Sequence, residues 1–195
     1  MSVARVDAMT LAKFLDWEAS RELKYEFDGF APVVMAGVSW EHSTIPANIM
    51  GILYDRLRGK PCRPHGSEVK VEVTGRIRYP DALVVCRPVA RGTNVITDPV
   101  VLFEILSDES GHRDRVTENE EYRRTPSVQR HVMLEQDEPA ATVFARDGDR
   151  WIGTPLKGDA VLSMPEIGAE FPLIEFPLIE CYEELTVPAD GPPAA

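Results

Sequence analysis

The sequence predicts a single α/β (α+β) domain, and three observations indicate it. The chain has 195 residues, enough for one domain with a full core, and no linker divides residues 1–185. Segments whose apolar residues recur at helical spacing alternate with short β-branched and aromatic runs. A hydrophobic content of 44% with 27% charged residues is typical of a globular protein. Residues 186–195 lack an apolar pattern, and we expect a disordered tail there.

Three helices are expected from apolar spacing and from capping residues. They cover about residues 11–19, 39–57 and 113–123. Thr10 can cap the first helix and Ser39 the second, which Gly59 ends. Pro46 must then lie in the first turns of the second helix or kink it.

Eight strands are expected from runs of apolar and β-branched residues between turn residues. They cover about residues 24–28, 32–36, 68–73, 78–85, 100–106, 130–135, 141–146 and 151–156. The first two strands read as a hairpin around Gly29. The pentapeptide Phe171–Glu175 is repeated at once as Phe176–Glu180, which we interpret as a local duplication in an edge segment.

Several features indicate a cytoplasmic protein without a membrane partner. No apolar run approaches the roughly 18–20 residues that a membrane helix needs. The first seven residues lack the apolar region of a signal peptide. Cys62, Cys86 and Cys181 are odd in number, far apart and without metal-ligand spacing, so we expect reduced thiols.

The net charge of −11 argues against a surface built to bind nucleic acid, which is usually basic. The charge is uneven, however, and basic residues gather in the middle of the chain. They are Arg56, Arg58, Lys60, Arg63, Lys70, Arg76 and Arg78. This cluster is consistent with a local basic face or with an ordinary solvated surface.

Two acidic residues interrupt runs that otherwise read as buried strands. Asp81 lies in the run 78–85, and Glu104 lies in the run 100–106. A buried carboxylate costs several kcal/mol unless a metal, a retained proton or a paired base compensates it. The loop between the two runs is too short for a crossover helix, so we expect adjacent strands in one sheet. If the two strands pair antiparallel, both carboxylates can point to one face, and a divalent cation such as Mg²⁺ would relieve their repulsion.

Each of these acidic residues also has a structural interpretation. Asp81 could cap a turn after Pro80, and Glu104 could pair with an arginine such as Arg78. Glu26, a third carboxylate in an otherwise apolar strand, could belong to the site or face solvent on an edge strand. His42 could approach the same cleft or serve as a capping or surface residue.

Six short segments occur in the order expected of one family. They are Lys24–Gly29, Trp40–His42, Arg78–Val85, Phe103–Ser107, Glu121–Tyr122 and Arg130–Asp137. Through them the chain resembles the Uma-type restriction endonucleases, a bacterial branch of the PD-(D/E)XK nuclease superfamily. The resemblance runs from about Thr10 to Glu184.

This resemblance implies a restriction-endonuclease-like core, in which helices flank a mixed central sheet that carries a metal site. It implies metal-dependent hydrolysis of phosphodiester bonds in DNA with Mg²⁺ or Mn²⁺. Pro80-Asp81 matches the family's PD and Glu104 its second acid, so both would hold the metal. Glu26 would bind it directly or through water. The resemblance also implies a homodimer, and the acidic net charge implies weak, metal-dependent DNA binding.

The chain departs from the family where a catalytic lysine is expected. The superfamily position two residues after the second acid is Leu106, and this branch is thought to supply the lysine from the following helix, where Glu118 aligns. Lys70, Arg113 and Arg115 are the candidates to replace it. The alternative is a catalytically degenerate member that retains the fold as a binding or interaction protein.

Overall fold

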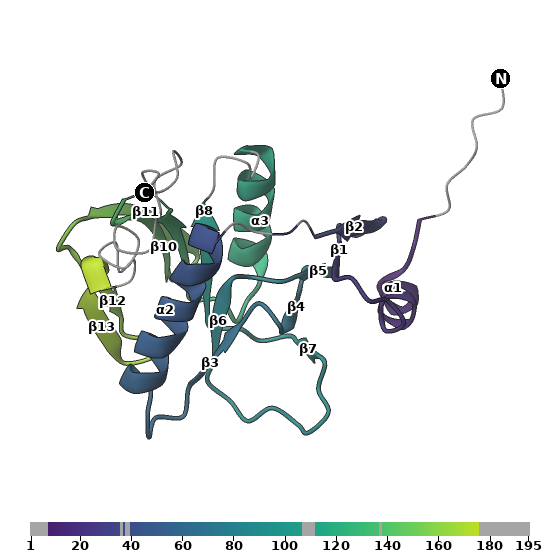
Figure 1. The fold of residues 1–195 in the computed structure, drawn as a ribbon, viewed down its shortest axis with the longest axis horizontal. Helices are drawn as coiled ribbons and strands as arrows, with labels where there is room; N and C mark the ends of the chain where they lie inside the picture. The colour runs from purple at the N-terminus through teal and green to yellow at the C-terminus, as the bar shows by residue number, and fades with distance from the viewer. Residues whose placement is uncertain (1–7, 36, 38–39, 107–111, 137, 176–195) are drawn as a thin grey trace, which may run out of the picture.

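The computed structural model describes residues 8–35, 37, 40–106, 112–136 and 138–175 (Figure 1). The expected tail at 186–195 therefore lies outside the described residues. Within them, the chain forms a six-stranded sheet, a five-stranded sheet, a two-stranded hairpin and three α-helices. No helix of this part is both long enough and apolar enough to cross a membrane.

The six-stranded sheet is the centre of the molecule, with strand order β11-β10-β9-β8-β6-β3. Its members are β3 (Arg63–Gly66), β6 (Ala82–Val85), β8 (Val101–Leu106), β9 (Arg130–Glu135), β10 (Ala140–Asp147) and β11 (Arg150–Lys157). β8 and β9 run parallel and the other pairs antiparallel, so the sheet is mixed. β6 and β8 are antiparallel neighbours, as predicted, with Ala82 opposite Phe103.

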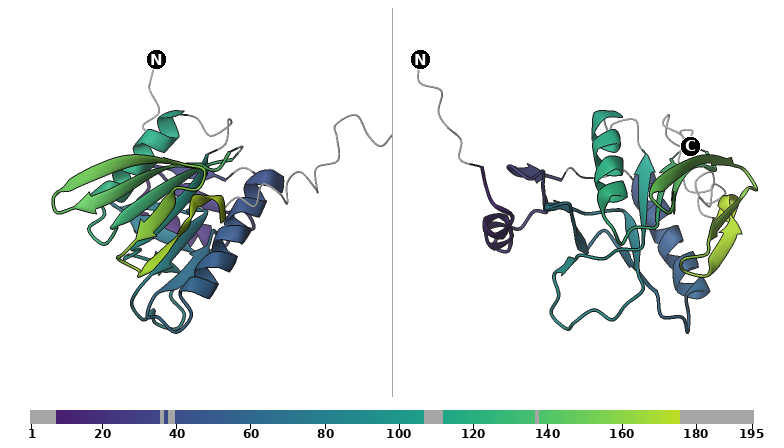
Figure 2. Two further views of the ribbon diagram at one scale, coloured as in Figure 1. Left: turned by 90° about the vertical axis from the view of Figure 1, so that its left-hand side faces the viewer. Right: turned by 180° about the vertical axis from the view of Figure 1, so that it is seen from behind.

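Two helices cover opposite faces of this sheet (Figure 2). α2 (Trp40–Arg56) packs Ile49 and Leu53 on the face that carries Val84. α3 (His112–Arg124) packs Tyr122 on the face that carries Leu83. Successive residues of a strand point to opposite faces, so a continuous apolar run such as Ala82–Val85 fills both cores. The predicted mixed sheet flanked by helices is confirmed.

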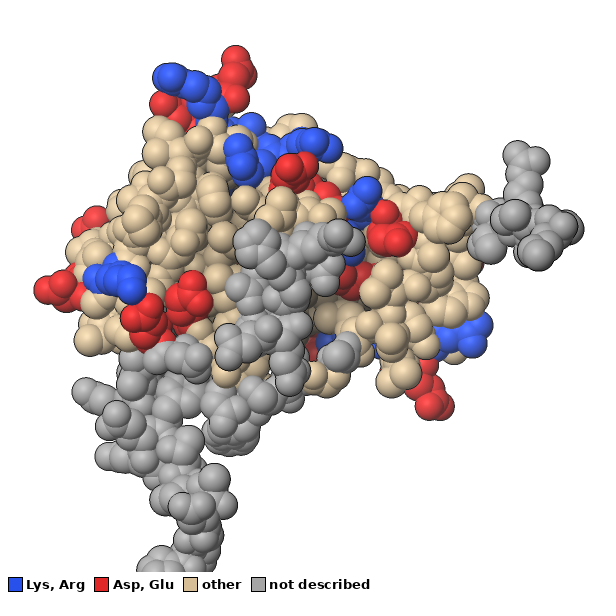
Figure 3. Space-filling view, turned by 90° about the horizontal axis from the view of Figure 1, so that it is seen from above, with Lys and Arg blue, Asp and Glu red and all other residues tan. Residues whose placement is uncertain are grey.

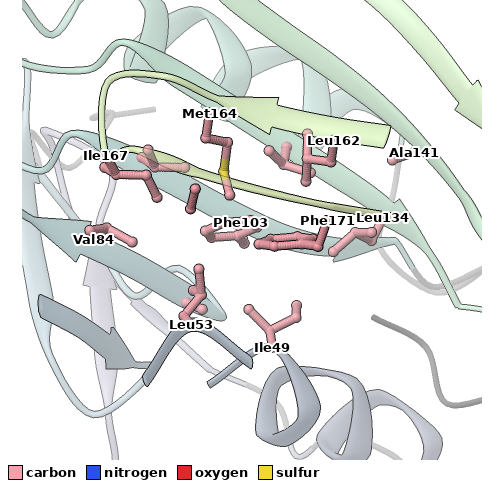
Figure 4. Packing of buried hydrophobic residues seen from close by; sticks show 14 of the residues in the cluster. Ile49, Leu53, Val84, Phe103, Leu134, Ala141, Leu162, Met164, Ile167 and Phe171 are labelled. Atoms are coloured by element: carbon pink, nitrogen blue, oxygen red, sulfur yellow. The ribbon is translucent and has the colours of Figure 1, made fainter. Parts of the chain in front are cut away.

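The larger core is closed by two strands that the sequence pattern did not indicate. β12 (Val161–Met164) and β13 (Ala169–Pro172) form a hairpin, followed by a 3-10 helix over Leu173–Glu175. Phe171 and Leu173 are buried against the α2 side of the sheet, and Figure 4 shows Phe171 beside Phe103. The first copy of the repeat thus contributes to the core, and the second copy lies outside the described residues.

The five-stranded sheet has the order β2-β1-β5-β4-β7. Its members are β1 (Tyr25–Phe27), β2 (Pro32–Val34), β4 (Lys70–Val73), β5 (Arg76–Arg78) and β7 (Val95–Ile96). α1 (Leu11–Glu18) packs Phe14 against Phe27, and Thr10 accepts a hydrogen bond from the Lys13 amide at 3.3 Å, which confirms it as the N-cap. Ser39 lies outside the described residues.

The prediction of one strand over residues 78–85 is wrong, and Pro80 gives the physical reason. The run divides into β5 and β6, which belong to different sheets. Proline has no N–H to donate to a strand ladder, so pairing is interrupted at Tyr79-Pro80-Asp81. The chain passes from one sheet to the other at this point, which places Asp81 at their junction.

The prediction of reduced thiols is wrong for Cys62 and Cys86, which form a disulfide. β3 pairs with β6 so that Arg63 lies opposite Val85. Each cysteine is the next residue outward on its strand, so the pairing of β3 with β6 brings the two sulfur atoms together. β3 has no β-rich pattern in the sequence, and its pairing could not be anticipated. Cys181 lies outside the described residues.

Candidate functional site

Asp81 and Glu104 meet at the junction of the two sheets. Asp81 directly precedes β6, and the next position across on β8 is Glu104. Asp81 Oδ2 accepts a hydrogen bond of 2.8 Å from the Ile105 amide, which fixes the Asp81 carboxylate against β8. The antiparallel register therefore brings together the two residues that the sequence pattern singled out.

The Glu104 carboxylate is held among other acidic groups. Its Oε1 accepts a hydrogen bond of 2.6 Å from the Tyr122 hydroxyl on α3. Burial raises the pKa of Glu104 well above its ordinary value, and the charges of Asp81 and Glu118 raise it further. The bond from Tyr122 acts in the opposite direction but is outweighed. Such a carboxylate favours a bound proton or a bound cation.

His42, at the start of α2, reaches the same site. Its Nε2 lies 3.1 Å from Asp81 Oδ1, and the ionised carboxylate can accept the ring N–H. This hydrogen bond raises the pKa of His42 above its ordinary value, although partial burial opposes the shift. The first turn of α2 thus contributes a side chain that contacts the carboxylate oxygen of Asp81 not bonded to β8.

Glu26 lies at the site but is paired with an arginine. Its Oε2 accepts from Arg78 Nη1 at 2.9 Å, and its Oε1 accepts from the Tyr79 amide at 3.2 Å. Burial raises the pKa of Glu26, and the charge of Arg78 only partly opposes this shift. Glu26 therefore faces the sheet junction and not the solvent.

Arg78 is a buried cation at the site, and the sequence pattern did not indicate it as a site residue. Its side chain is 7% exposed and binds Glu121 twice, at 2.9 Å through Nε and 3.1 Å through Nη2. Arg76 contacts the same Glu121 carboxylate. Burial alone would lower the pKa of Arg78, but Glu121 and Glu26 raise it. The signal available in the sequence was its position two residues before Pro80.

The candidates to replace the lysine are Lys70, Arg113 and Arg115, and the structure describes the side chain of Lys70 alone. Lys70 contacts the Glu18 carboxylate on α1, which also accepts a 2.6 Å hydrogen bond from the Tyr79 hydroxyl. Lys70 is thereby held beside α1 and is not brought to Asp81 or Glu104 by any described contact. The side chains of Arg113 and Arg115 lie outside the described residues. Glu118 is close enough to raise the pKa of Glu104, so a further acidic residue lies near the site.

The donor set fits a hard divalent cation. In the part of the chain that the structure describes, no three His, Cys, Asp or Glu side chains form a ready metal site. Mg²⁺ commonly uses one or two carboxylates and completes its shell with water and phosphate oxygens. Asp81 and Glu104 are two carboxylates of that kind, and their mutual repulsion favours a cation between them. Glu26 is already bonded to Arg78 and suits contact through water.

Comparison with known proteins is consistent with this geometry. Residues 11–173 match the sequence model of the Uma2 family, "Putative restriction endonuclease". Two uncharacterized proteins of Synechocystis are similar. One, slr1290, is 26% identical over 82% of this chain and 86% of its own length. The other, sll1609, is 24% identical over 82% of this chain and 93% of its own length.

The fold is also similar to a solved structure, a crystal structure of "a putative nuclease belonging to DUF820" from Anabaena variabilis. The TM-score is 0.72 with 17% sequence identity. The match covers 87% of this chain and 98% of the other. At this identity the likeness establishes the shared fold.

Proposed function

Because this chain belongs to the Uma2 family, described as "Putative restriction endonuclease", we propose that it hydrolyses phosphodiester bonds in DNA with Mg²⁺ or Mn²⁺. Asp81 and Glu104 would hold the metal, and Glu26 would contact it through water. The observation that supports this most is the pair of interacting carboxylates on neighbouring strands at the sheet junction. Double-strand cleavage would require two such sites, which a homodimer would supply.

A bound divalent cation would polarise the scissile phosphate and lower the pKa of a bound water. The residues of the chain would provide the orientation that this chemistry needs. Ile105 and His42 hold the two oxygens of Asp81, and Tyr122 holds one oxygen of Glu104. A protonated His42 would also place a positive charge beside the approaching phosphate. Arg78 would keep Glu26 directed at the junction.

Hydrolysis should be slow if Glu118 occupies the position of the family's lysine. A lysine would orient water and stabilise charge that develops on the phosphate. Glu118 adds negative charge instead, and the charge of Arg78 is shared between Glu26 and Glu121. The same observation favours the second candidate function, a degenerate member that retains the fold for binding.

A plasmid-nicking assay tests the proposal. We expect the purified chain to nick supercoiled DNA with Mn²⁺ and to be inactive in EDTA. Asp81→Asn and Glu104→Gln should both abolish nicking because each removes a metal ligand. Asp147→Asn, in an exposed acid of the β10–β11 hairpin, is the control and should leave activity unchanged. Activity that survives both site substitutions would exclude this assignment.

Glu118→Lys separates the two candidate functions. If Glu118 occupies the lysine position, the substitution should raise the nicking rate by about 10²–10⁴-fold, the usual contribution of a general acid or base. An inert natural chain that gains activity through this substitution would favour the degenerate member. A natural chain that is active and indifferent to Glu118→Lys would show that another group acts in place of the lysine.

A further inference from the structure

A basic surface lies at the far end of α2 from His42. Residues 54–63 carry four basic side chains and one acidic residue, Asp55, whereas the whole chain has 21 Lys and Arg against 32 Asp and Glu. The local excess of positive charge is therefore opposite in sign to the charge of the molecule. Figure 3 views the molecule from above, from the side opposite to the lower end of α2 in Figure 1, and on that face acidic and basic side chains interleave.

Two of these four basic residues, Arg58 and Arg63, line a hollow of about 410 Å³, here called the Tyr54 hollow. Its lining consists of Tyr54, Leu57, Arg58, Gly59, Arg63 and Pro64. Leu57 is buried, whereas Tyr54 is 54% exposed. An exposed aromatic ring and two guanidinium groups thus line one depression in the surface.

The four basic side chains differ in the contacts that they already make within the protein. Arg56 pairs with Glu175 at 3.1 Å, and Lys60 donates to the Gly168 carbonyl. Arg63 donates through Nη1 to the Cys62 carbonyl at 2.8 Å and to the Lys60 carbonyl, which orients its guanidinium. An arginine has five N–H donors, so others can reach a ligand.

Arg58 is a highly accessible cation. Its side chain is 83% exposed, and its contact with Asp55 is 4.0 Å long. Exposed pairs of this kind contribute little to stability, so Asp55 does not hold the Arg58 guanidinium firmly. Arg58 can turn toward an anion at the hollow without breaking a strong interaction.

We propose that the Tyr54 hollow binds the backbone of a DNA strand, away from the site of hydrolysis. Guanidinium groups match phosphate oxygens in geometry and charge, and an exposed aromatic ring can stack on a base. On a molecule with a net charge of −11, a local positive surface is where DNA can approach without repulsion. This inference rests on the proposed function, because it takes DNA as the substrate.

The distance along α2 between the hollow and the site is short enough for one DNA molecule to span. α2 carries His42 at its start and Tyr54 in its last turn, and Figure 1 shows the helix extending between these two ends. Twelve residues of α-helix span about 18 Å at about 1.5 Å per residue. This distance corresponds to about five base pairs at about 3.4 Å each. Phosphate contacts of this kind fix the register of DNA without reading its sequence.

The test is DNA binding measured in EDTA, where the metal site does not contribute. Fluorescence anisotropy would give Kd as a function of salt concentration. The probe is a labelled duplex of about 20 bp, or about two helical turns. Arg58→Ala should weaken binding about tenfold at about 0.1 M salt and reduce the slope of log Kd against log salt by about one. In a second titration with one labelled strand alone, Tyr54→Ala should weaken binding at least about fivefold, because the ring can stack on an unpaired base.

Arg150→Ala is the matched control. Arg150 is 85% exposed and lies 4.0 Å from Asp147 three residues earlier, as Arg58 lies from Asp55. The control removes the same charge in the same local setting, at the β10–β11 hairpin, and should change Kd less than about twofold if the hollow is specific. Equal effects of Arg58→Ala and Arg150→Ala would overturn the proposal, as would unchanged binding in both variants.

The outcome is separable from that of the proposed function. Arg58→Ala should leave Mn²⁺ binding unchanged, since Arg58 is at the other end of α2 from His42. A natural chain that binds DNA through the hollow but never nicks it would contradict the proposed hydrolysis and support the hollow. A chain that nicks DNA, but whose Kd for DNA does not change in Arg58→Ala or Tyr54→Ala, would support the proposed hydrolysis and contradict the hollow as a binding site.

Discussion

The side chain of Glu104 lies near Tyr122, Asp81 and Glu118 on a strand whose other residues are apolar. The strand itself could be predicted, and so could the conflict between its apolar character and a carboxylate. The partners could not, because Tyr122 and Glu118 lie on a polar helix whose spacing carries no sign of the contact. The partners of Arg78 could not be predicted either. Its sequence neighbours indicated a site, but its two carboxylate partners come from β1 and α3.

The raised pKa of Glu104 predicts a pH-dependent loss of stability in the metal-free protein. A carboxyl group whose pKa is higher in the folded state favours folding below its unfolded value of about 4.5, and this contribution is lost as pH rises through the folded-state pKa. Glu104→Gln, which cannot ionise, should therefore be more stable than the natural chain at pH 8 in EDTA.

The expected difference is a higher free energy of unfolding for Glu104→Gln than for the natural chain at pH 8. Urea unfolding at pH 4 and pH 8 would measure it, and the gain should be absent at pH 4. Glu138→Gln, at an exposed residue, is the control. If the free energy of unfolding depends on pH in the same way in both variants and in the natural chain, ionisation of Glu104 does not destabilise the folded state.

At the scale of elements, sequence patterns located the three helices and the pairing of β6 with β8. They failed where tertiary contacts decide the structure. β7 has two residues, and β3 contains Pro64 and Gly66, so neither shows a strand pattern. Both form because a neighbouring strand offers a partner. The division at Pro80 could have been predicted, since proline rarely occurs inside a paired central strand.

The Cys62–Cys86 disulfide predicts that reductant destabilises the protein. The two cysteines are 24 residues apart, and a cross-link of that length should stabilise the folded state by about 3 kcal/mol through the lost entropy of the unfolded chain. Urea unfolding with and without dithiothreitol would measure this loss. The double variant Cys62→Ser, Cys86→Ser should not respond to dithiothreitol. A natural chain that is equally insensitive would show that the thiols are reduced.

At the scale of the whole molecule, the two sheets meet where the chain crosses from β5 to β6, and the acidic site forms at this crossing. Composition could predict the net charge of −11 but not its distribution, which depends on which faces the elements expose. The structure separates the acidic site from the basic surface by most of the length of α2. Net charge alone would have argued against a nucleic-acid substrate, whereas this separation is compatible with one.

The central claim is that Asp81 and Glu104 hold a divalent cation, and Mn²⁺ titration calorimetry tests it most directly. The natural chain should bind Mn²⁺ near neutral pH, and Asp81→Asn and Glu104→Gln should each weaken that binding by at least about tenfold. Asp147→Asn should bind as the natural chain does. Mn²⁺ binding that is unchanged in both site variants, or absent from the natural chain, would contradict the account.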